Sequence, residues 1–219
     1  MLFVGRVIPN KKVEDLIRFF LVYHSCYNPR SRLLLVGAQS GFERYLASLH
    51  GLVATLGAAH VHFIGHVSDA ELAAYYEVAD LFLCASEHEG FCVPIVEAFY
   101  EEVPVLAYAA TAVPATMDGA GVLYDEKDPV HVATLMDAVV SNTALRDAIV
   151  RAQLDAIDRL RSRDFAGTLL GFVDDILSSP RGPEPSVAAD FWHQFDEAQE
   201  LDELRLYRPA IYRALPEAR

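Results

Sequence analysis

The chain has 219 residues, of which 53% are hydrophobic and 11% aromatic, so it can bury a sizeable core and is not a disordered segment. Its net charge of −13 argues against nucleic acid or an anionic membrane surface as the main partner. We expect neither a transmembrane segment nor a signal peptide, and the three scattered cysteines (Cys26, Cys84, Cys92) favour a reducing, cytoplasmic location without disulfides.

Strands alternate with helices along most of the chain. Short apolar runs predict six buried strands, at residues 2–5, 32–37, 61–65, 80–85, 104–108 and 122–124. Helical periodicity and capping signals predict helices at 11–27, 42–56, 68–78, 93–102 and 129–177, the last with a break at Ser141-Asn142. This alternation predicts an α/β fold: a doubly wound parallel sheet of about six strands with C-terminal helices, whose ligands bind at the carboxyl ends of the strands.

The composition predicts three parts. Residues 1–178 form the Rossmann-like domain, residues 179–186 form a linker rich in proline and serine, and residues 187–219 form a helical extension. An apolar stripe in this extension either packs back on the domain or docks on a missing partner domain: Phe191, Phe195, Ala198, Leu201 and Leu204. Because Met1 leads directly into the first strand, we expect the chain to begin at a domain boundary.

The stretch 86–98 organises the chemistry of the chain. It follows the fourth predicted strand and turns through Gly90, which lets the backbone approach a ligand closely, into a helix that begins near Val93. A helix N-terminus offers unpaired N–H groups and a partial positive charge. Because Glu89 and Glu97 frame this turn, the stretch predicts a socket for a hydroxyl-rich, anionic ligand.

The same stretch carries a family resemblance. Seven residues separate Glu89 from Glu97, with Gly90, Phe91 and Pro94 between them and Ala98 after them. This pattern resembles the E-x7-E motif of the retaining family-4 glycosyltransferases, which have the GT-B fold, and the resemblance covers residues 2–178. It implies the C-terminal, donor-binding domain of such an enzyme, with a nucleotide-diphosphate sugar as donor and no metal. It also implies that an N-terminal acceptor-binding domain or partner chain is absent from this sequence.

Two cations follow the first predicted strand. Gly5 and Arg6 end that strand, and Lys11 comes five residues later, so both charges are expected at the carboxyl edge of the sheet. An arginine fork and a lysine point charge suit a pyrophosphate. The resemblance implies this role as well, since the family's G-R-x4-K spacing holds the donor diphosphate. Taken alone, the spacing fits two solvated charges at a strand end, and the second motif is what favours function.

The remaining roles come from the resemblance. Glu97 is expected to accept hydrogen bonds from the ribose hydroxyls, and Glu89 is expected to contact the transferred sugar and to serve catalysis with the two cations. The amides of Phe91, Cys92 and Val93 are expected to touch the sugar or the phosphate.

The loop after the third predicted strand, Gly65-His66-Val67, has a family counterpart beside the nucleotide base. His66 either stacks on the base or is an exposed loop histidine without a role.

The sequence departs from the family pattern at three positions where glycine is usual: Lys12, Cys92 and Glu102. At Cys92 this departure bears on the choice of sugar, because the residue belongs to the expected sugar loop.

Metal binding finds little support in the sequence. Neither the pair His60 and His62 nor the run Glu87-His88-Glu89 completes a set of metal ligands, and Cys92 has no evident base to make it a nucleophile. The leading interpretation is therefore the donor-binding domain of a retaining, metal-independent hexosyltransferase that uses a UDP- or GDP-sugar and is inactive without its acceptor-binding part. The alternatives are a non-catalytic nucleotide-sugar-binding or regulatory module, a sugar-nucleotide epimerase of the same fold, and a doubly wound domain without a sugar ligand.

Overall fold

The computed structural model describes residues 1–179 and 197–213. Its contacts divide the chain into two units, residues 1–163 and residues 164–219, whereas the sequence placed the end of the first domain at residue 178. Residues 180–186 of the predicted linker, and Phe191 and Phe195 of the predicted stripe, lie outside the described part.

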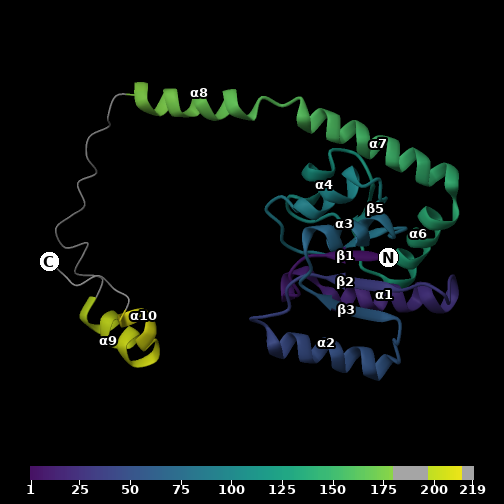
Figure 1. Ribbon diagram of the computed structural model, residues 1–219, viewed down its shortest axis with the longest axis horizontal. Helices are drawn as coiled ribbons and strands as arrows, with labels where there is room; N and C mark the ends of the chain where they lie inside the picture. The colour runs from purple at the N-terminus through teal and green to yellow at the C-terminus, as the bar shows by residue number, and fades with distance from the viewer. Residues whose placement is uncertain (180–196, 214–219) are drawn as a thin grey trace. The chain divides into compact units, whose positions relative to one another are not determined.

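Six parallel strands form a single sheet in the first unit (Figure 1). They are β1 (Leu2–Val4), β2 (Leu33–Val36), β3 (Val61–Gly65), β4 (Phe82–Cys84), β5 (Val105–Tyr108) and β6 (Val122–Tyr124). Their order is β3-β2-β1-β4-β5-β6, with Leu2 of β1 opposite Leu34 on one side and Phe82 on the other. This confirms the predicted doubly wound α/β fold. The order reverses between β1 and β4, which is the point where such sheets bind ligands.

Helices cover both faces of this sheet. They are α1 (Val13–Cys26), α2 (Glu43–Leu56), α3 (Asp69–Glu77), α4 (Val93–Tyr100), α5 (Val113–Met117), α6 (Pro129–Ser141) and α7 (Thr143–Arg161). Residues of α1, α2 and α6 belong to one core cluster, and residues of α3, α4 and α5 belong to the other. Successive side chains of a strand point to opposite faces of the sheet, so Phe3 of β1 belongs to the first cluster and Leu2 to the second. Both faces of the sheet are therefore buried, as the continuous apolar runs predict.

The long helical pattern of residues 129–177 breaks twice. The predicted break at Ser141-Asn142 is confirmed, since the Asn142 side chain accepts a hydrogen bond from the amide of Leu145 at 3.1 Å and begins α7. A second break follows Arg161 and was not predicted; there the Asp164 side chain accepts from the amide of Gly167 at 2.7 Å. Both breaks therefore have the short polar side chains that favour helix N-caps.

A buried glutamine ties α7 to the sheet. The side-chain amide of Gln153 donates to the carbonyl of Val103 at 2.9 Å and accepts from the amide of Val105 at 2.9 Å. Gln153 is fully buried, so these bonds satisfy polar groups that water does not reach. The first backbone N–H of β5 is thus paired with a side chain of α7 that lies 48 residues further along the chain.

Left-handed backbone occurs at the three positions where the resemblance led us to expect glycine. The φ angles are +52° at Lys12, +66° at Cys92 and +57° at Glu102. A side chain costs energy in this region because its Cβ crowds the backbone, whereas glycine adopts it freely. The departures noted in the sequence therefore coincide with local strain.

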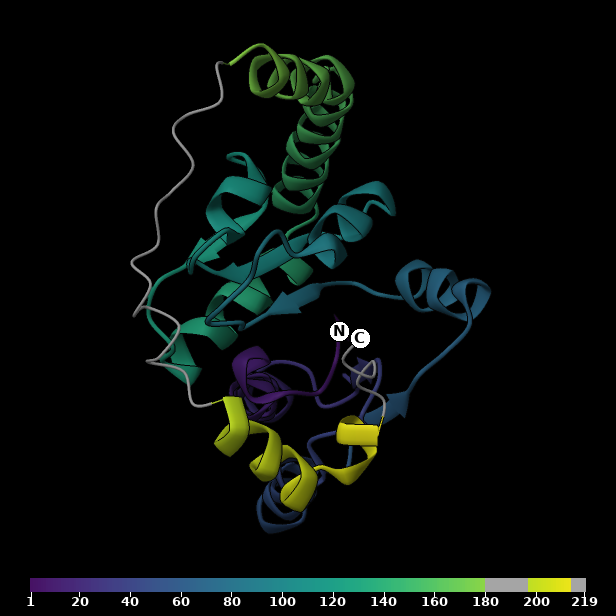
Figure 2. The ribbon, with the colours of Figure 1, turned by 90° about the vertical axis from the view of Figure 1, so that its left-hand side faces the viewer.

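The second unit contains α8 (Phe165–Ser178), α9 (Glu197–Tyr207) and α10 (Pro209–Arg213). The last two, yellow in Figures 1 and 2, contact each other. The described portion of the predicted helical extension at 187–219 therefore contains α9, which carries Leu201 and Leu204. Several apolar side chains of α8 are exposed: Phe165, Leu169, Leu170, Phe172, Ile176 and Leu177. Among the described residues, no helix has both the length and the apolar character that crossing a bilayer requires.

Candidate functional site

A pocket of about 360 Å³ opens where β1 and β4 end. It is lined by the strand ends, the loop after β1 and the loop that leads from β4 to α4, including Gly5, Arg6, Asn10, Lys11, Cys84, Ser86, His88, Glu89, Gly90 and Cys92. The pocket therefore lies at the switch point of the sheet. It brings together some of the residues from each of two separate sequence motifs.

The two cations of the pocket differ in their pairing. The ammonium of Lys11 lies 2.5 Å from a carboxylate oxygen of Glu89, and these side chains are only 17% and 9% exposed. Arg6 is exposed and makes no ion pair with any acid in the described part of the chain. The pocket thus offers a guanidinium that is free to bind an anion beside an ammonium that already has a partner.

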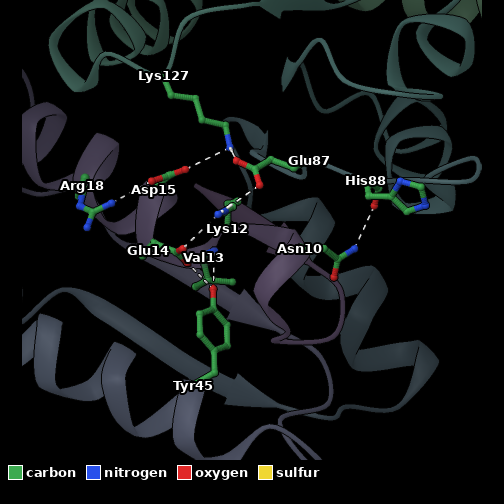
Figure 3. A network of polar contacts seen from close by, with 10 residues as sticks. All are labelled: Asn10, Lys12, Val13, Glu14, Asp15, Arg18, Tyr45, Glu87, His88 and Lys127. Atoms are coloured by element: carbon green, nitrogen blue, oxygen red, sulfur yellow. Dashed lines mark hydrogen bonds and ion pairs between the residues drawn. The ribbon is translucent and has the colours of Figure 1, made fainter.

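A short 3-10 helix, η1 (Pro9–Lys11), brings Lys11 to Glu89. The carbonyl of Asn10 accepts a hydrogen bond from the amide of Glu87 at 2.9 Å, and its side chain donates to the carbonyl of His88 at 3.0 Å (Figure 3). These bonds hold the loop after β1 against the loop after β4. The sequence led us to expect Lys11 in the following helix, whereas the left-handed residue Lys12 separates it from α1.

A second set of hydrogen bonds, from Thr111 and Thr116, holds the loop between β4 and α4. The hydroxyl of Thr111 accepts from the amide of Glu89 at 2.9 Å and lies 3.1 Å from the carbonyl of Glu89, to which it donates. The hydroxyl of Thr116 donates to the carbonyl of Phe91. Neither threonine was predicted from the sequence, because α5, which holds Thr116 and follows Thr111, is too short to show helical periodicity. Pro114 in the first turn of α5 was the available signal.

Lysines beside the pocket are neutralised by acids (Figure 3). The ammonium of Lys127 lies 3.1 Å from both Asp15 and Glu87, and that of Lys12 lies 3.2 Å from Glu87. The hydrogen bond from Lys127, together with that from Lys12, lowers the pKa of the Glu87 carboxyl. These cations are therefore engaged with the protein itself, unlike Arg6.

Glu97 does not line the pocket that holds Lys11 and Glu89. It lines a second pocket, of about 390 Å³, whose walls come from α3, α4 and α7. There the hydroxyl of Tyr76 donates to its carboxylate at 2.9 Å, and burial, followed by the charge of Glu97, raises the pKa of Tyr76. The structure thus separates the two glutamates of the motif, which the sequence placed in one socket.

The other predicted contact residues lie outside the lining of the first pocket. Phe91 and Val93 are 44% and 54% exposed beside the start of α4. His66 is exposed after β3, and Val67 is half-buried against the core. Any role for these residues requires a ligand that extends beyond this pocket.

An open parallel sheet, with a pocket at its switch point that charged side chains help to line, defines a Rossmann-like domain. Residues 1–154 match the family described as glycosyl transferases group 1, and the chain belongs to this family.

Named relatives match the chain over part of their length. The phosphatidyl-myo-inositol mannosyltransferase of Mycobacterium leprae is 32% identical over 194 residues, which are 86% of this chain and 49% of that protein. The O-antigen chain mannosyltransferase B of Escherichia coli is 28% identical over 127 residues, 58% of this chain and 33% of that protein. The matched segment therefore spans less than half the length of each of these relatives.

Solved structures agree with the family assignment. The C-terminal domain of a group 1 glycosyl transferase from Francisella tularensis superposes with a TM-score of 0.63 and 27% identity, covering 72% of this chain and 83% of that one. HepE from Anabaena, solved with UDP and glucose, gives a TM-score of 0.64 and 25% identity, covering 82% and 48%. The fold is thus that of the C-terminal domain of a GT-B glycosyltransferase.

Proposed function

We propose that this chain is the donor-binding domain of a retaining glycosyltransferase, which transfers a hexosyl group from a UDP- or GDP-sugar to an acceptor and needs no metal for the transfer. The observation that carries the proposal is the single pocket in which Arg6, Lys11 and Glu89 meet, in a chain of this family. The choice of donor is supported by a structural neighbour solved with UDP and glucose and by a relative named GDP-mannose-dependent alpha-mannosyltransferase.

The proposed chemistry assigns charge stabilisation to the two cations. In this proposal Arg6 and Lys11, which both line the pocket, stabilise the negative charge that develops on the diphosphate as it leaves. Glu89 accepts hydrogen bonds from hydroxyls of the transferred sugar and exchanges its present contact with Lys11 for them.

The nucleoside part of the donor is proposed to bind beyond this pocket. Glu97 holds the ribose hydroxyls, and the loop of His66 and Val67 lies beside the base. The amides of Phe91, Cys92 and Val93 contact the sugar or the phosphate at the start of α4.

Acceptor binding is proposed to reside in a further domain or a partner chain, because the relatives are more than twice as long as their matched part. Positioning of the acceptor can supply roughly 7–11 kcal/mol of a barrier, and these residues do not provide it. We therefore propose that this chain alone binds donor weakly and transfers nothing.

Calorimetric titration of the purified chain with UDP, GDP and ADP, and with the matching nucleosides, tests the proposal. Arg6→Ala should weaken diphosphate binding by roughly 1.5–3 kcal/mol, the range for a charge-assisted hydrogen bond, and leave nucleoside binding unchanged. Arg30→Ala is the matched control, because this exposed arginine precedes β2 and so lies at the opposite edge of the sheet. Equal losses for diphosphate and nucleoside would contradict the phosphate role.

A further inference from the structure

Two cysteines and a glutamate converge inside the pocket. The sulfur atoms of Cys84 and Cys92 and a carboxylate oxygen of Glu89 all lie within 4.8 Å of one another. Cys84 is the last residue of β4 and is 1% exposed, and Cys92 immediately precedes α4 and is 9% exposed. The fold of the loop, rather than chance contact at a surface, brings these three groups together.

A buried hydroxyl beside the cluster lacks a partner. The side-chain oxygen of Ser86 is buried beside the thiol of Cys84 and makes no hydrogen bond of ordinary geometry within the described part of the chain. Ser86 lines the same pocket as the two cysteines and Glu89. Buried hydroxyls are normally hydrogen-bonded, so an unpaired one in a pocket indicates room for a further polar or coordinating group.

We propose that Cys84, Cys92 and Glu89 form a binding site for a soft divalent cation of the zinc class. Paired thiolates select such ions over magnesium or calcium, and three protein ligands leave the fourth tetrahedral position open to the pocket. Coordination distances of about 2.3 Å to sulfur and about 2.0–2.2 Å to oxygen place ligand atoms about 3.5–4 Å apart, so the cluster closes on an ion with small side-chain movements.

The site competes with the ion pair of the pocket. A bound cation takes the carboxylate of Glu89, which now lies 2.5 Å from the ammonium of Lys11, and Lys11 turns away to solvent. The protons of both thiols pass to solvent on binding. Cation binding at this site depends on the cluster alone and not on the proposed glycosyl donor.

Titration of the reduced chain with CdCl₂, followed by the ultraviolet charge-transfer band between thiolate and Cd²⁺, tests this site. We expect one Cd²⁺ per chain, held by two thiolates. Cys92→Gly and Cys84→Ala should each abolish this two-thiolate complex. Cys92→Gly removes a ligand at a left-handed position that glycine adopts without strain, so loss of binding cannot be ascribed to misfolding once circular dichroism shows a folded chain.

Two further variants sharpen the test. Glu89→Gln should weaken Cd²⁺ binding by at least about 10-fold, because loss of a direct ligand costs no less than loss of a group that only supports a ligand. Cys26→Ser is the matched control and should keep the complex, because Cys26 is exposed and outside the cluster. A complex that survives Cys92→Gly, disappears in Cys26→Ser or contains a single thiolate would overturn the site. Nucleotide titration without metal reports on the proposed function separately.

Discussion

The ammonium of Lys11 and the carboxylate of Glu89 form an ion pair of 2.5 Å across the pocket, between the loop after β1 and the loop after β4. The residue expected to hold phosphate is therefore neutralised by the residue expected to hold sugar. An incoming diphosphate has to displace Glu89 from Lys11 before it gains the full attraction of the ammonium.

This pairing predicts that Glu89→Gln tightens the binding of UDP or GDP. The substitution removes the competing charge, and an ion pair near a surface is worth about 1 kcal/mol or more, so we expect an affinity increase of about fivefold. Discrimination among sugars should fall at the same time. Calorimetry with diphosphates and with their sugars measures both effects. Glu77→Gln, at an exposed glutamate that ends α3, is the control and should change neither the affinity nor the discrimination. Weaker diphosphate binding by Glu89→Gln would rule out competition between Glu89 and the diphosphate for Lys11.

Thr111 holds the backbone of Glu89, so Thr111→Val should loosen that loop. The valine keeps the branched shape but loses two hydrogen bonds, each worth about 1 kcal/mol. We expect lower stability by about 1–2 kcal/mol and faster hydrogen exchange confined to residues 86–92. Thr55→Val on the exposed side of α2 is the control, because Thr55 makes no side-chain hydrogen bond among the described residues. Unchanged exchange in the loop would show that Thr111 does not position Glu89.

Glu102→Gly should stabilise the first unit, because glycine relieves the left-handed strain at φ +57°. The relief of about 1–2 kcal/mol exceeds the entropy cost of glycine, which leaves a gain of up to about 1 kcal/mol. Glu101→Gly is the matched control: the neighbouring residue has φ −85°, so glycine there brings the entropy cost without relief. Urea unfolding of both variants decides the matter, and a loss of stability in Glu102→Gly would refute the strain argument.

Glu87 should add to stability at neutral pH but not at acidic pH. Its pKa is lowered in the folded state, chiefly by Lys127, so its contribution is present above the ordinary value of 4.5 and is lost as the pH falls through the lowered value. The gain is below about 1 kcal/mol, since the Glu87 side chain is 48% exposed and water screens the pair. Unfolding of Glu87→Gln should therefore differ from wild type at neutral pH and converge with it in acid. Glu126→Gln, an exposed acid without an ion pair in the described region, should show no such convergence.

The sheet and the place of the pocket were predictable from the sequence because they depend on local pattern and one topological rule. Apolar runs and helical spacing gave the six strands, and the carboxyl ends of parallel strands share one edge. Gly5, Arg6 and Lys11 were thereby expected near Glu89, and the structure places them in one pocket.

The pairings within that pocket were not predictable, since each joins residues far apart in the chain. Lys11 and Glu89 are separated by 78 positions, and so are Asn10 and His88. The sequence spacing also grouped Glu97 with Glu89. In the structure Glu97 follows the first turn of α4, and its carboxylate contacts the hydroxyl of Tyr76. The convergence of Cys84 with Cys92 likewise depends on how the loop closes, which no sequence pattern specifies.

The hydrogen bonds of Gln153 set a lower limit on the shortest stretch of this chain that can fold on its own. The family match ends at residue 154, just past this glutamine. Ala156 and Ile157 follow on α7 and are buried in the core that covers α4. In a polypeptide ending at residue 154, Gln153 would lie at the frayed end of α7, which would weaken its hydrogen bonds to Val103 and Val105. The core residues that Ala156 and Ile157 cover would also be exposed. We therefore expect autonomous folding to need α7 at least through Ile157, beyond the segment that matches the family.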